Sequence, residues 1–317
     1  MKLGFLIPNH PNEKRVALLP EHVKDFNNEL VVETGFGETL GISDEEYVKA
    51  GCTIASREDI FKTCEGIFSL KVLKPQDYQH IREGQIIVGW THPEGSGKIF
   101  MEEQGIPKNL IIVDLDNIHP SIYYKNYVIP MDWIPSNFVR KNSYIAGYAS
   151  TMHAVMNYGS IPTSETKVAI LGSGNVSQGA FSAISKFNSD IRMFYRKTMN
   201  QLKDELEEFD IIINGIEMDN PNKHILTLED QMKLKKNCLI IDAAANLGKA
   251  IEGARHTTAS DPIYNKDGKY YYAVNNSPSI FYRQSSKAIS EAFSKYVYSK
   301  ELEFYLDVVA EAEEMIV

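Results

Sequence analysis

A glycine-rich turn between an apolar run and a helical stretch constrains the fold of this chain most strongly. The apolar run covers residues 167–171, and Gly172, Gly174 and Ser177 follow it in the spacing of a phosphate-binding loop. Glycine permits a tight turn at the first position and close approach to a pyrophosphate at the second, while a small third residue lets helix and strand pack closely. Because a helix start also offers N–H donors to an anion, the pattern predicts a dinucleotide site at Gly172, Ser173, Gly174, Asn175, Val176 and Ser177. A glycine turn without a ligand is the alternative.

Strands and helices alternate on both sides of this turn. After it, apolar runs predict strands, with helices ending near residues 187 and 208 and another over 226–234; the strands are 167–171, 191–195, 210–216 and 238–243. Before it, amphipathic stretches separate further runs at 3–7, 30–33, 67–71, 86–90 and 110–115. This alternation is typical of parallel sheets covered by helices. We therefore predict an α/β chain with two Rossmann-like, doubly wound domains, mostly parallel sheets and an interdomain cleft.

The domain boundaries follow from one long helical segment. Residues 142–158 read as a helix between the Pro135 loop and a stop at Gly159 and Pro162, and this helix is the candidate connector. The chain of 317 residues suits two domains. We predict a substrate domain over residues 1–140, completed by C-terminal helices at about 285–317 that cross back to it. The NADP-binding domain is predicted over 141–284, with the connecting helix.

The composition of the chain restricts the kinds of molecule that it is expected to bind. The formal net charge is −9, which disfavours nucleic acid and anionic membranes as partners. The longest apolar runs fall far short of the roughly 20 residues that span a bilayer. Three cysteines without CxxC spacing argue against a disulfide framework or a metal site, and only five uncharged residues follow Lys2, too few for a signal-peptide core. We expect a cytoplasmic enzyme with small-molecule partners, no nucleic acid, no membrane and no metal.

The end of the second strand after the glycine turn indicates which dinucleotide binds. NAD-binding chains place an acidic residue about 20 positions after the loop to hold the ribose hydroxyls. Here Arg196, Lys197 and Thr198 follow Tyr195 instead. Two cations and a hydroxyl suit the extra phosphate of NADP(H), although a basic pair is more often a solvated surface feature.

Three residues of the N-terminal half could act on a substrate. Arg15 lies in a polar segment after the first strand, where a guanidinium could bind a carboxylate in bidentate fashion. Lys71 and His92 end apolar runs, and the carboxyl ends of strands form the edge where open α/β sheets bind ligands. A histidine there could serve as general acid or base. Taken singly, each residue is more often structural or solvated.

Over nearly its whole length the chain resembles the superfamily of alanine dehydrogenase, saccharopine dehydrogenase and the transhydrogenase alpha subunit. The resemblance rests on residues 12–18, on residues 78–92 and on Asn276 with Pro278. It implies that Arg15 binds the substrate carboxylate and that Lys71 binds substrate next to the catalytic His92. It also implies that Asn276 lies near the nicotinamide.

Within that superfamily the chain is most similar to a shorter, NADPH-dependent branch, the N5-(carboxyethyl)ornithine synthases. The similar strings are residues 89–93, 171–176, 193–199, 211–217 and 269–272. This resemblance implies reductive condensation of pyruvate with the side-chain amine of L-ornithine or L-lysine, through an imine reduced by hydride. The product would be N5-(1-carboxyethyl)ornithine or its lysine analogue. It also implies a homo-oligomer, expected as a tetramer.

One position departs from the pattern of alanine dehydrogenases. Asp242 is present, but Asn246 stands four residues later where those enzymes have an aspartate, and an amide cannot take up a proton as a carboxylate does. Two other functions stay open: reductive amination of a 2-oxo acid with free ammonia, and a non-catalytic NADP-binding module. The preference between ornithine and lysine, the new stereocentre and the residues that anchor the second substrate also stay open.

Overall fold

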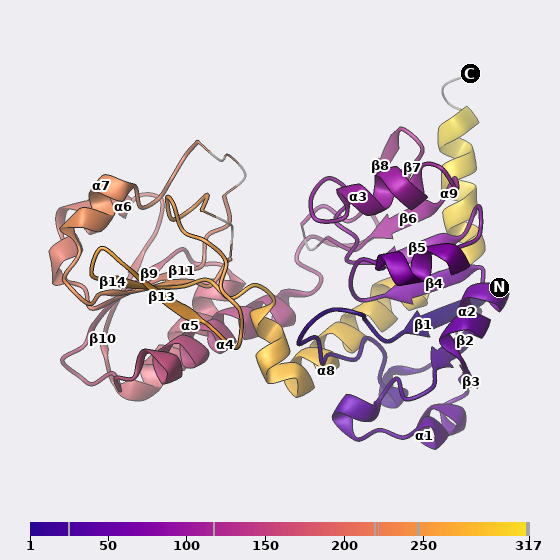
Figure 1. Cartoon of the computed structure of the whole chain (residues 1–317), viewed down its shortest axis with the longest axis horizontal. Helices are drawn as coiled ribbons and strands as arrows, with labels where there is room; N and C mark the ends of the chain where they lie inside the picture. Colours follow the sequence, from indigo (N-terminus) through magenta and orange to yellow (C-terminus); the bar gives the residue numbers. More distant parts are fainter. Residues whose placement is uncertain (25, 117, 219, 221, 246–247, 315–317) are drawn as a thin grey trace. The chain divides into compact units, whose positions relative to one another are not determined.

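The computed structural model describes residues 1–24, 26–116, 118–218, 220, 222–245 and 248–314. They form two compact units: Met1–Val139 with Ser286–Val317, and Arg140–Ser285. Figure 1 follows the chain through both units. Each is an α/β unit built on one mostly parallel sheet, as the sequence predicts.

The sheet of the first unit has the order β3-β2-β1-β4-β5-β6-β7-β8. Its strands are β1 (Lys2–Leu6), β2 (Glu29–Glu33), β3 (Thr53–Ala55), β4 (Gly66–Ser69), β5 (Ile86–Gly89), β6 (Ile111–Asp114), β7 (Ser121–Tyr124) and β8 (Tyr127–Pro130). The first six are parallel in the order 3-2-1-4-5-6 of doubly wound dinucleotide folds, and β7 and β8 add an antiparallel hairpin. The strand order reverses between β1 and β4.

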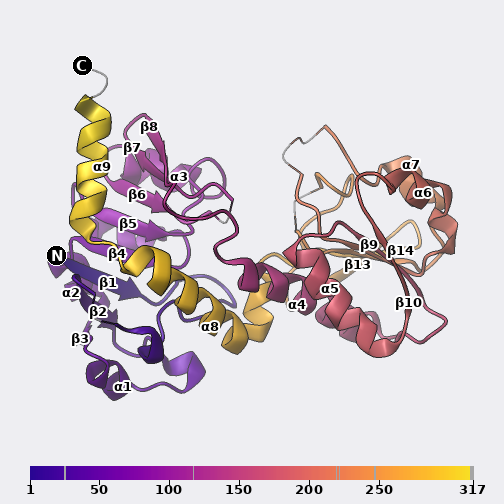
Figure 2. The same cartoon turned by 180° about the vertical axis from the view of Figure 1, so that it is seen from behind.

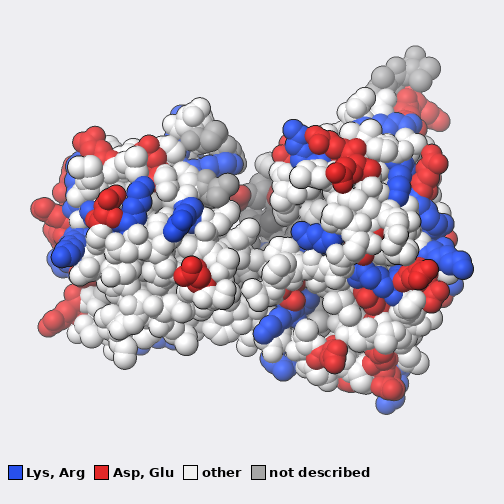
Figure 3. Space-filling model, in the orientation of Figure 1, with Lys and Arg blue, Asp and Glu red and all other residues white. Residues whose placement is uncertain are grey.

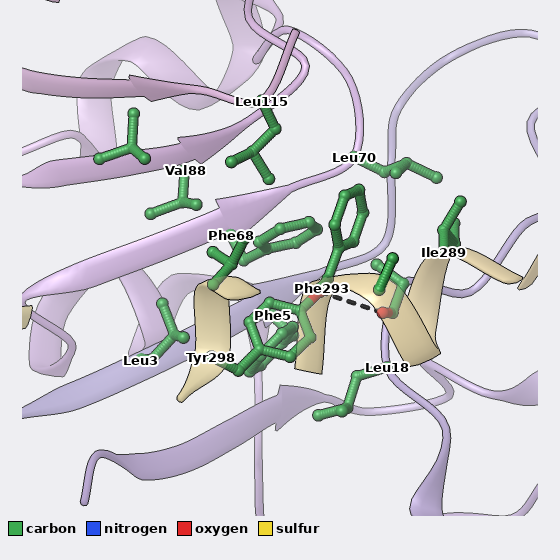
Figure 4. Close-up of a cluster of buried hydrophobic side chains, with 14 of the residues drawn as sticks. Leu3, Phe5, Leu18, Phe68, Leu70, Val88, Leu115, Ile289, Phe293 and Tyr298 are labelled. Atoms are coloured by element: carbon green, nitrogen blue, oxygen red, sulfur yellow. Dashed lines mark hydrogen bonds between the residues drawn. The ribbon is translucent and has the colours of Figure 1, made fainter. Parts of the chain in front are cut away.

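Alternation along the strands sends side chains to two cores. Phe5 and Phe68 point to the face covered by the C-terminal helices, and Leu6 and Ile67 point to the face covered by α2. The helices of this unit are α1 (Asp44–Lys49), α2 (Arg57–Thr63), α3 (Lys98–Phe100) and α9 (Leu302–Glu314). Helix α8 (Tyr282–Phe293) belongs to it from Ser286 onward. Figure 2 shows α9 beside this sheet, and Figure 4 shows Phe293 and Tyr298 against Phe5 and Phe68. The C-terminal segment therefore completes the core of the first unit.

The second unit carries the glycine-rich turn. Its sheet has the order β10-β9-β11-β12-β14-β13, parallel except for β13. The strands are β9 (Lys167–Leu171), β10 (Asp190–Phe194), β11 (Ile211–Asn214), β12 (Leu239–Asp242), β13 (Ile263–Lys266) and β14 (Lys269–Tyr272). The helices are α4 (Arg140–Tyr158), α5 (Asn175–Ile184), α6 (Met199–Asp204) and α7 (Leu228–Lys233). The order reverses between β9 and β11, directly beside the turn.

Helices α4 and α5 pack through two glycines. A Cβ at Gly147 would lie 1.8 Å from the carbonyl oxygen of Val176, and one at Gly179 would lie 1.9 Å from that of Tyr144. Both distances are far below contact, so only glycine allows these backbones to meet. This crossing fixes α4 on α5, whose first turn follows Gly174.

Several details of the sequence prediction are wrong. Strand β4 ends at Ser69, so Lys71, the last residue of the predicted strand, lies in a loop two residues beyond the observed one. The helices predicted at about 285–317 are present as α8 and α9, with a π-helical turn at Ser294–Tyr298 after α8 and a start of α9 at Leu302. Five short strands were not predicted: β3, β7, β8, β13 and β14. All of them pair at or near a sheet edge, where the apolar pattern of the sequence is weaker than in a central strand.

Short helical turns fill the connections. The 3-10 helices are Pro20–His22, Glu38–Leu40, Pro75–His80, Ser185–Phe187, Leu206–Glu208 and Ser277–Phe281, and a second π-helical turn covers Met101–Gly105. Within the described ranges, no helix has the length and apolar character that crossing a membrane requires. On the face shown in Figure 3, acidic and basic side chains are interspersed.

Candidate active site

The carboxyl edge of the first sheet gathers the predicted substrate residues. The chain leaves β1 into the loop that carries Arg15, leaves β4 toward Lys71, and leaves β5 toward His92. Gly89 ends β5 with a φ of +152°, and a Cβ there would lie 1.8 Å from the carbonyl oxygen of Ser69. Glycine therefore lets the ends of β4 and β5 meet closely, at the point where their loops separate.

Arg15 is buried rather than solvated, with a relative exposure of 3%. Its Nε and Nη2 atoms donate to the two carboxylate oxygens of Glu13 at 2.8 and 2.7 Å. The guanidinium carbon lies 5.0 Å from the centroid of the Trp90 ring. The hydroxyl of Ser286 accepts a hydrogen bond from the next backbone amide, Val16 N, at 2.8 Å. The C-terminal segment thus holds the loop, and Glu13 fixes the plane of the guanidinium.

Lys71 faces the same aromatic ring. Its Nζ atom lies 5.5 Å from the Trp90 centroid. Burial and, to a smaller extent, the positive charge of Arg15 together lower the pKa of Lys71 to about 8, against the opposite effect of Glu13. The Ser69 hydroxyl donates to the Lys71 carbonyl at 2.6 Å and fixes the loop backbone. The structure therefore brings Arg15 and Lys71 to one indole.

His92 is held separately, by a strained turn. Its φ is +44°, in the left-handed region that side chains disfavour. The carboxylate of Asp114 accepts bonds from the backbone N–H groups of Thr91 and His92 at 2.8 and 2.9 Å, and the His92 carbonyl accepts from Gly95 and Gly97. Burial is the main cause that raises the pKa of Asp114, and these donors oppose it. The turn therefore places His92 at the carboxyl edge of the sheet.

Three residues of this edge escaped the sequence prediction: Glu13, Trp90 and Asp114. Glu13 and Trp90 lie two residues before Arg15 and His92, and Asp114 pairs in the sheet with Gly89, three residues before His92. A carboxylate at the end of a buried strand was the available signal for Asp114. No sequence signal could place Glu13 and Trp90 against Arg15, because these contacts depend on how the loops fold.

The glycine turn of the second unit has the geometry that its sequence predicts. Gly172 has a φ of +96°, and its N–H donates to the carbonyl of Phe194 at 2.8 Å, which joins the turn to the end of β10. Ser177 is fully buried and donates to the Leu171 carbonyl at 2.9 Å. A Cβ at Gly174 would meet no atom within 4 Å, so the backbone at the start of α5 is open to approach. These features suit a pyrophosphate at the helix start.

The cation pair after β10 is exposed on a closed turn. Arg196 and Lys197 lie between Tyr195 and Thr198, and the Tyr195 N–H donates to the Thr198 hydroxyl at 2.9 Å. Asn276 has a left-handed φ of +66° at the start of a 3-10 helix. Asn246, where alanine dehydrogenases have an aspartate, lies outside the described residues.

A buried pair that the sequence reasoning missed lies at the ends of β11 and β12. The Asn214 amide donates to the Asp242 carboxylate at 2.9 Å, and both residues are almost wholly buried. The same amide donates to the Ile216 carbonyl. This pair fixes the strand ends beside the glycine turn. Across the described parts of the chain, no group of three or more His, Cys, Asp or Glu side chains is placed to hold a metal ion.

Comparison with known proteins tests the resemblance. The model described as "Alanine dehydrogenase/PNT, N-terminal domain" matches residues 8–119, and its C-terminal counterpart matches residues 185–315. The chain is 96% identical over 317 residues to N(5)-(carboxyethyl)ornithine synthase of Clostridium botulinum (strain Hall), with 100% of both chains covered. The chain belongs to the N(5)-(carboxyethyl)ornithine synthase family.

The chain is also similar to proteins of lower sequence identity. The enzyme of the same name from Lactococcus lactis subsp. lactis (strain IL1403) is 52% identical over 308 residues, covering 97% of this chain and 99% of its own. A solved L-alanine dehydrogenase has a TM-score of 0.79 at 17% identity, covering 98% of this chain and 94% of its own. A transhydrogenase from Sinorhizobium meliloti has a TM-score of 0.74 at 18% identity, covering 95% of both. The predicted superfamily and α/β fold are confirmed.

Membership of the N(5)-(carboxyethyl)ornithine synthase family makes the chain an oxidoreductase that acts on CH–NH donors. The wider alanine dehydrogenase/PNT family binds a nicotinamide cofactor. Both statements agree with the glycine turn of the second unit.

Proposed function

We propose that the chain joins pyruvate to the side-chain amine of L-ornithine, with L-lysine as the second choice, and reduces the product with NADPH. The observation that carries this proposal is the pair of cations, buried Arg15 and half-buried Lys71, that lie over one indole at the edge of the first sheet. These two cations, with the carboxylate of Glu13 on Arg15, suit the carboxylate of a monoanionic 2-oxo acid as ligand. The name of the relatives at 96% and 52% identity supports the choice of amine.

The second unit fits NADPH by its chemistry. The open backbone at Gly174 suits the pyrophosphate, and exposed Arg196 and Lys197 suit an additional phosphate on the ribose. NADPH supplies a hydride when it is bound. We assign Gly172 to Ser177 and Arg196 with Lys197 to cofactor binding, and Asn276 to the nicotinamide end.

The residues of the first unit then act on the keto acid. Arg15 and Lys71 would hold the pyruvate carboxylate and orient its keto carbon toward the incoming amine, since both cations are fixed on one ring. The neutral side-chain amine adds to the keto carbon and gives a carbinolamine. His92 would move a proton from the added amine nitrogen to the former keto oxygen and then deliver a second proton, taken up from solvent, to the hydroxyl, so that water leaves and the nitrogen lone pair forms the C=N bond of a protonated imine.

Reduction completes the reaction. NADPH bound at Gly172 to Ser177 would supply the hydride whose electron pair forms the C–H bond at the former keto carbon, and the π electrons of the protonated imine would return to nitrogen. The product is a secondary amine with one more carboxyethyl group. Arg15 would keep the new carboxylate in place during this step.

The test is a substrate panel with the purified chain. NADPH oxidation is followed with pyruvate fixed while ornithine, lysine, alanine, ammonium and ornithine acetylated on its side-chain nitrogen are varied, and the products are identified by mass. We expect ornithine to react fastest and its product to exceed ornithine by one carboxyethyl unit less the hydrogen replaced. The acetylated ornithine is the matched control, because it keeps the α-amine and should not react.

Two outcomes would overturn the proposal. Alanine formed from ammonium at a comparable rate would indicate reductive amination of the alanine dehydrogenase kind. NADPH that binds but is not oxidised with any amine would indicate a non-catalytic module.

A further inference from the structure

Trp90 joins the two cations of the substrate edge. It follows β5 directly, and both Arg15 and Lys71 lie over its ring, at 5.0 and 5.5 Å from the centroid. We propose that Trp90 is a positioning residue that holds Arg15 and Lys71 together as a clamp for one carboxylate. The assignment of that carboxylate to pyruvate rests on the proposed function.

The indole is itself rigidly placed. Its Nε1–H donates to the carbonyl of Leu115 at 2.8 Å, and the ring meets Phe293 edge-on with the centroids 5.7 Å apart. Its relative exposure is 8%. The hydrogen bond of the indole N–H and the packing of the ring therefore fix the face of the indole in the absence of substrate.

Electrostatics gives this ring a role beyond packing. Two like charges repel each other strongly when they are shielded from water, and Arg15 does lower the pKa of Lys71. Glu13 forms an ion pair with Arg15. The negative face of an indole attracts cations, and this attraction grows when they are desolvated. Trp90 thus offsets part of the repulsion that would otherwise separate Arg15 from Lys71.

The charged and titratable groups around Lys71 determine which group a transition near pH 8 can be assigned to. Arg15, Glu13 and His10, all from the loop after β1, interact with its charge. The pKa of His10 is lowered by burial and by Lys71, so His10 is neutral in the alkaline range where Lys71 titrates. A transition near pH 8 therefore belongs to Lys71.

The first experiment needs no substrate. The chain has two tryptophans, and Trp133, which packs on Phe304 with centroids 4.9 Å apart, lies outside the proposed clamp. Trp133→Phe leaves Trp90 as the sole indole. We expect its fluorescence to change in one transition near pH 8, and Lys71→Met in the same background to abolish that transition. A Trp90 emission that is independent of pH would overturn the contact between the ring and Lys71.

The second experiment measures the clamp in turnover. We expect Trp90→Leu to raise KM for pyruvate about tenfold and to move the alkaline limb of the pH profile to lower pH, with KM for NADPH unchanged. Trp90→Phe keeps an aromatic face and should recover most of the affinity. Trp133→Phe is the matched control and should leave KM and the pH profile as in the unaltered chain.

The outcomes of the two experiments distinguish failure of the role proposed for Trp90 from failure of the proposed function. A Trp90→Leu enzyme with unaltered KM for pyruvate and pH profile would overturn the proposal. So would equal loss of affinity for pyruvate and NADPH, since that would show a purely structural residue. If the chain oxidises no NADPH with pyruvate but Trp90 still reports the Lys71 transition, the proposed function fails and the paired cations stand.

Discussion

At the scale of single residues, Lys71 links substrate binding to pH. Its pKa is lowered to about 8, and only the protonated ammonium attracts a carboxylate. Protonation falls from about nine tenths at pH 7 to about one tenth at pH 9, so KM for pyruvate should rise about tenfold over that range. Lys71→Arg keeps its charge and should lose this alkaline rise. Steady-state kinetics from pH 6.5 to 9.5 provide the check, and an unchanged rise in Lys71→Arg would point to another group.

His92 is expected to act in turnover and not in cofactor binding. His92→Ala should lower kcat by about two to four orders of magnitude, the range that a positioned acid or base contributes, with NADPH affinity near normal. His80→Ala is the matched control, because His80 stacks on Phe61 away from this turn. Nearly full turnover by His92→Ala would remove the imidazole from the mechanism.

Arg196 should discriminate between the two dinucleotides. A charge-assisted bond to a phosphate contributes about 1.5–3 kcal/mol, so Arg196→Ala should weaken NADPH binding about ten- to a hundredfold and leave NADH nearly unchanged. Arg192→Ala is the control: Arg192 is on β10 but pairs with Glu205, so the ratio of the two affinities should hold. Equal losses for both dinucleotides in Arg196→Ala would show a structural role, and calorimetric titration of the parent chain and the two variants measures all six affinities.

At the scale of elements, substitutions at the crossing of α4 and α5 should affect stability, whereas a substitution in the glycine turn should affect cofactor binding. Gly147→Ala places a methyl group 1.8 Å from the Val176 carbonyl, so it must push the helices apart and should lower stability by about 1–3 kcal/mol. Gly174→Ala meets no atom within 4 Å and should leave the melting temperature nearly unchanged while weakening NADPH binding. Thermal melting and cofactor titration of both variants distinguish these effects. A stable Gly147→Ala would contradict the close crossing.

At the scale of the whole molecule, the C-terminal segment should control the stability of the first unit. Phe293 is fully buried against Phe68 and Trp90, and Phe293→Ala should cost about 3–5 kcal/mol. Both tryptophans belong to this unit, so their fluorescence during denaturation reports its unfolding. Phe181→Ala, at an exposed position of α5, should have little effect. If Phe293→Ala unfolds at the same denaturant concentration as the parent chain, the segment is not part of this core.

The sequence by itself determined the features that depend on local pattern. Alternating apolar runs identified the main parallel strands within a few residues, because buried parallel strands must be apolar throughout. The turn at Gly172 and Gly174 could be predicted, because its backbone geometry requires glycine. The edge strands could not be predicted, since their formation depends on pairing with strands distant in the sequence.

Only the tertiary structure decided how the substrate edge is built. Arg15 reads as a solvated loop residue in the sequence, yet Glu13 and Trp90 surround it, and Ser286, from the far end of the chain, holds the next backbone amide. The lowered pKa of Lys71 likewise has no local cause, because burial and the charge of Arg15 arise when separate loops meet at the carboxyl ends of β1, β4 and β5. Local sequence sets backbone conformation, whereas desolvation and charge pairing depend on what the fold brings within a few ångströms.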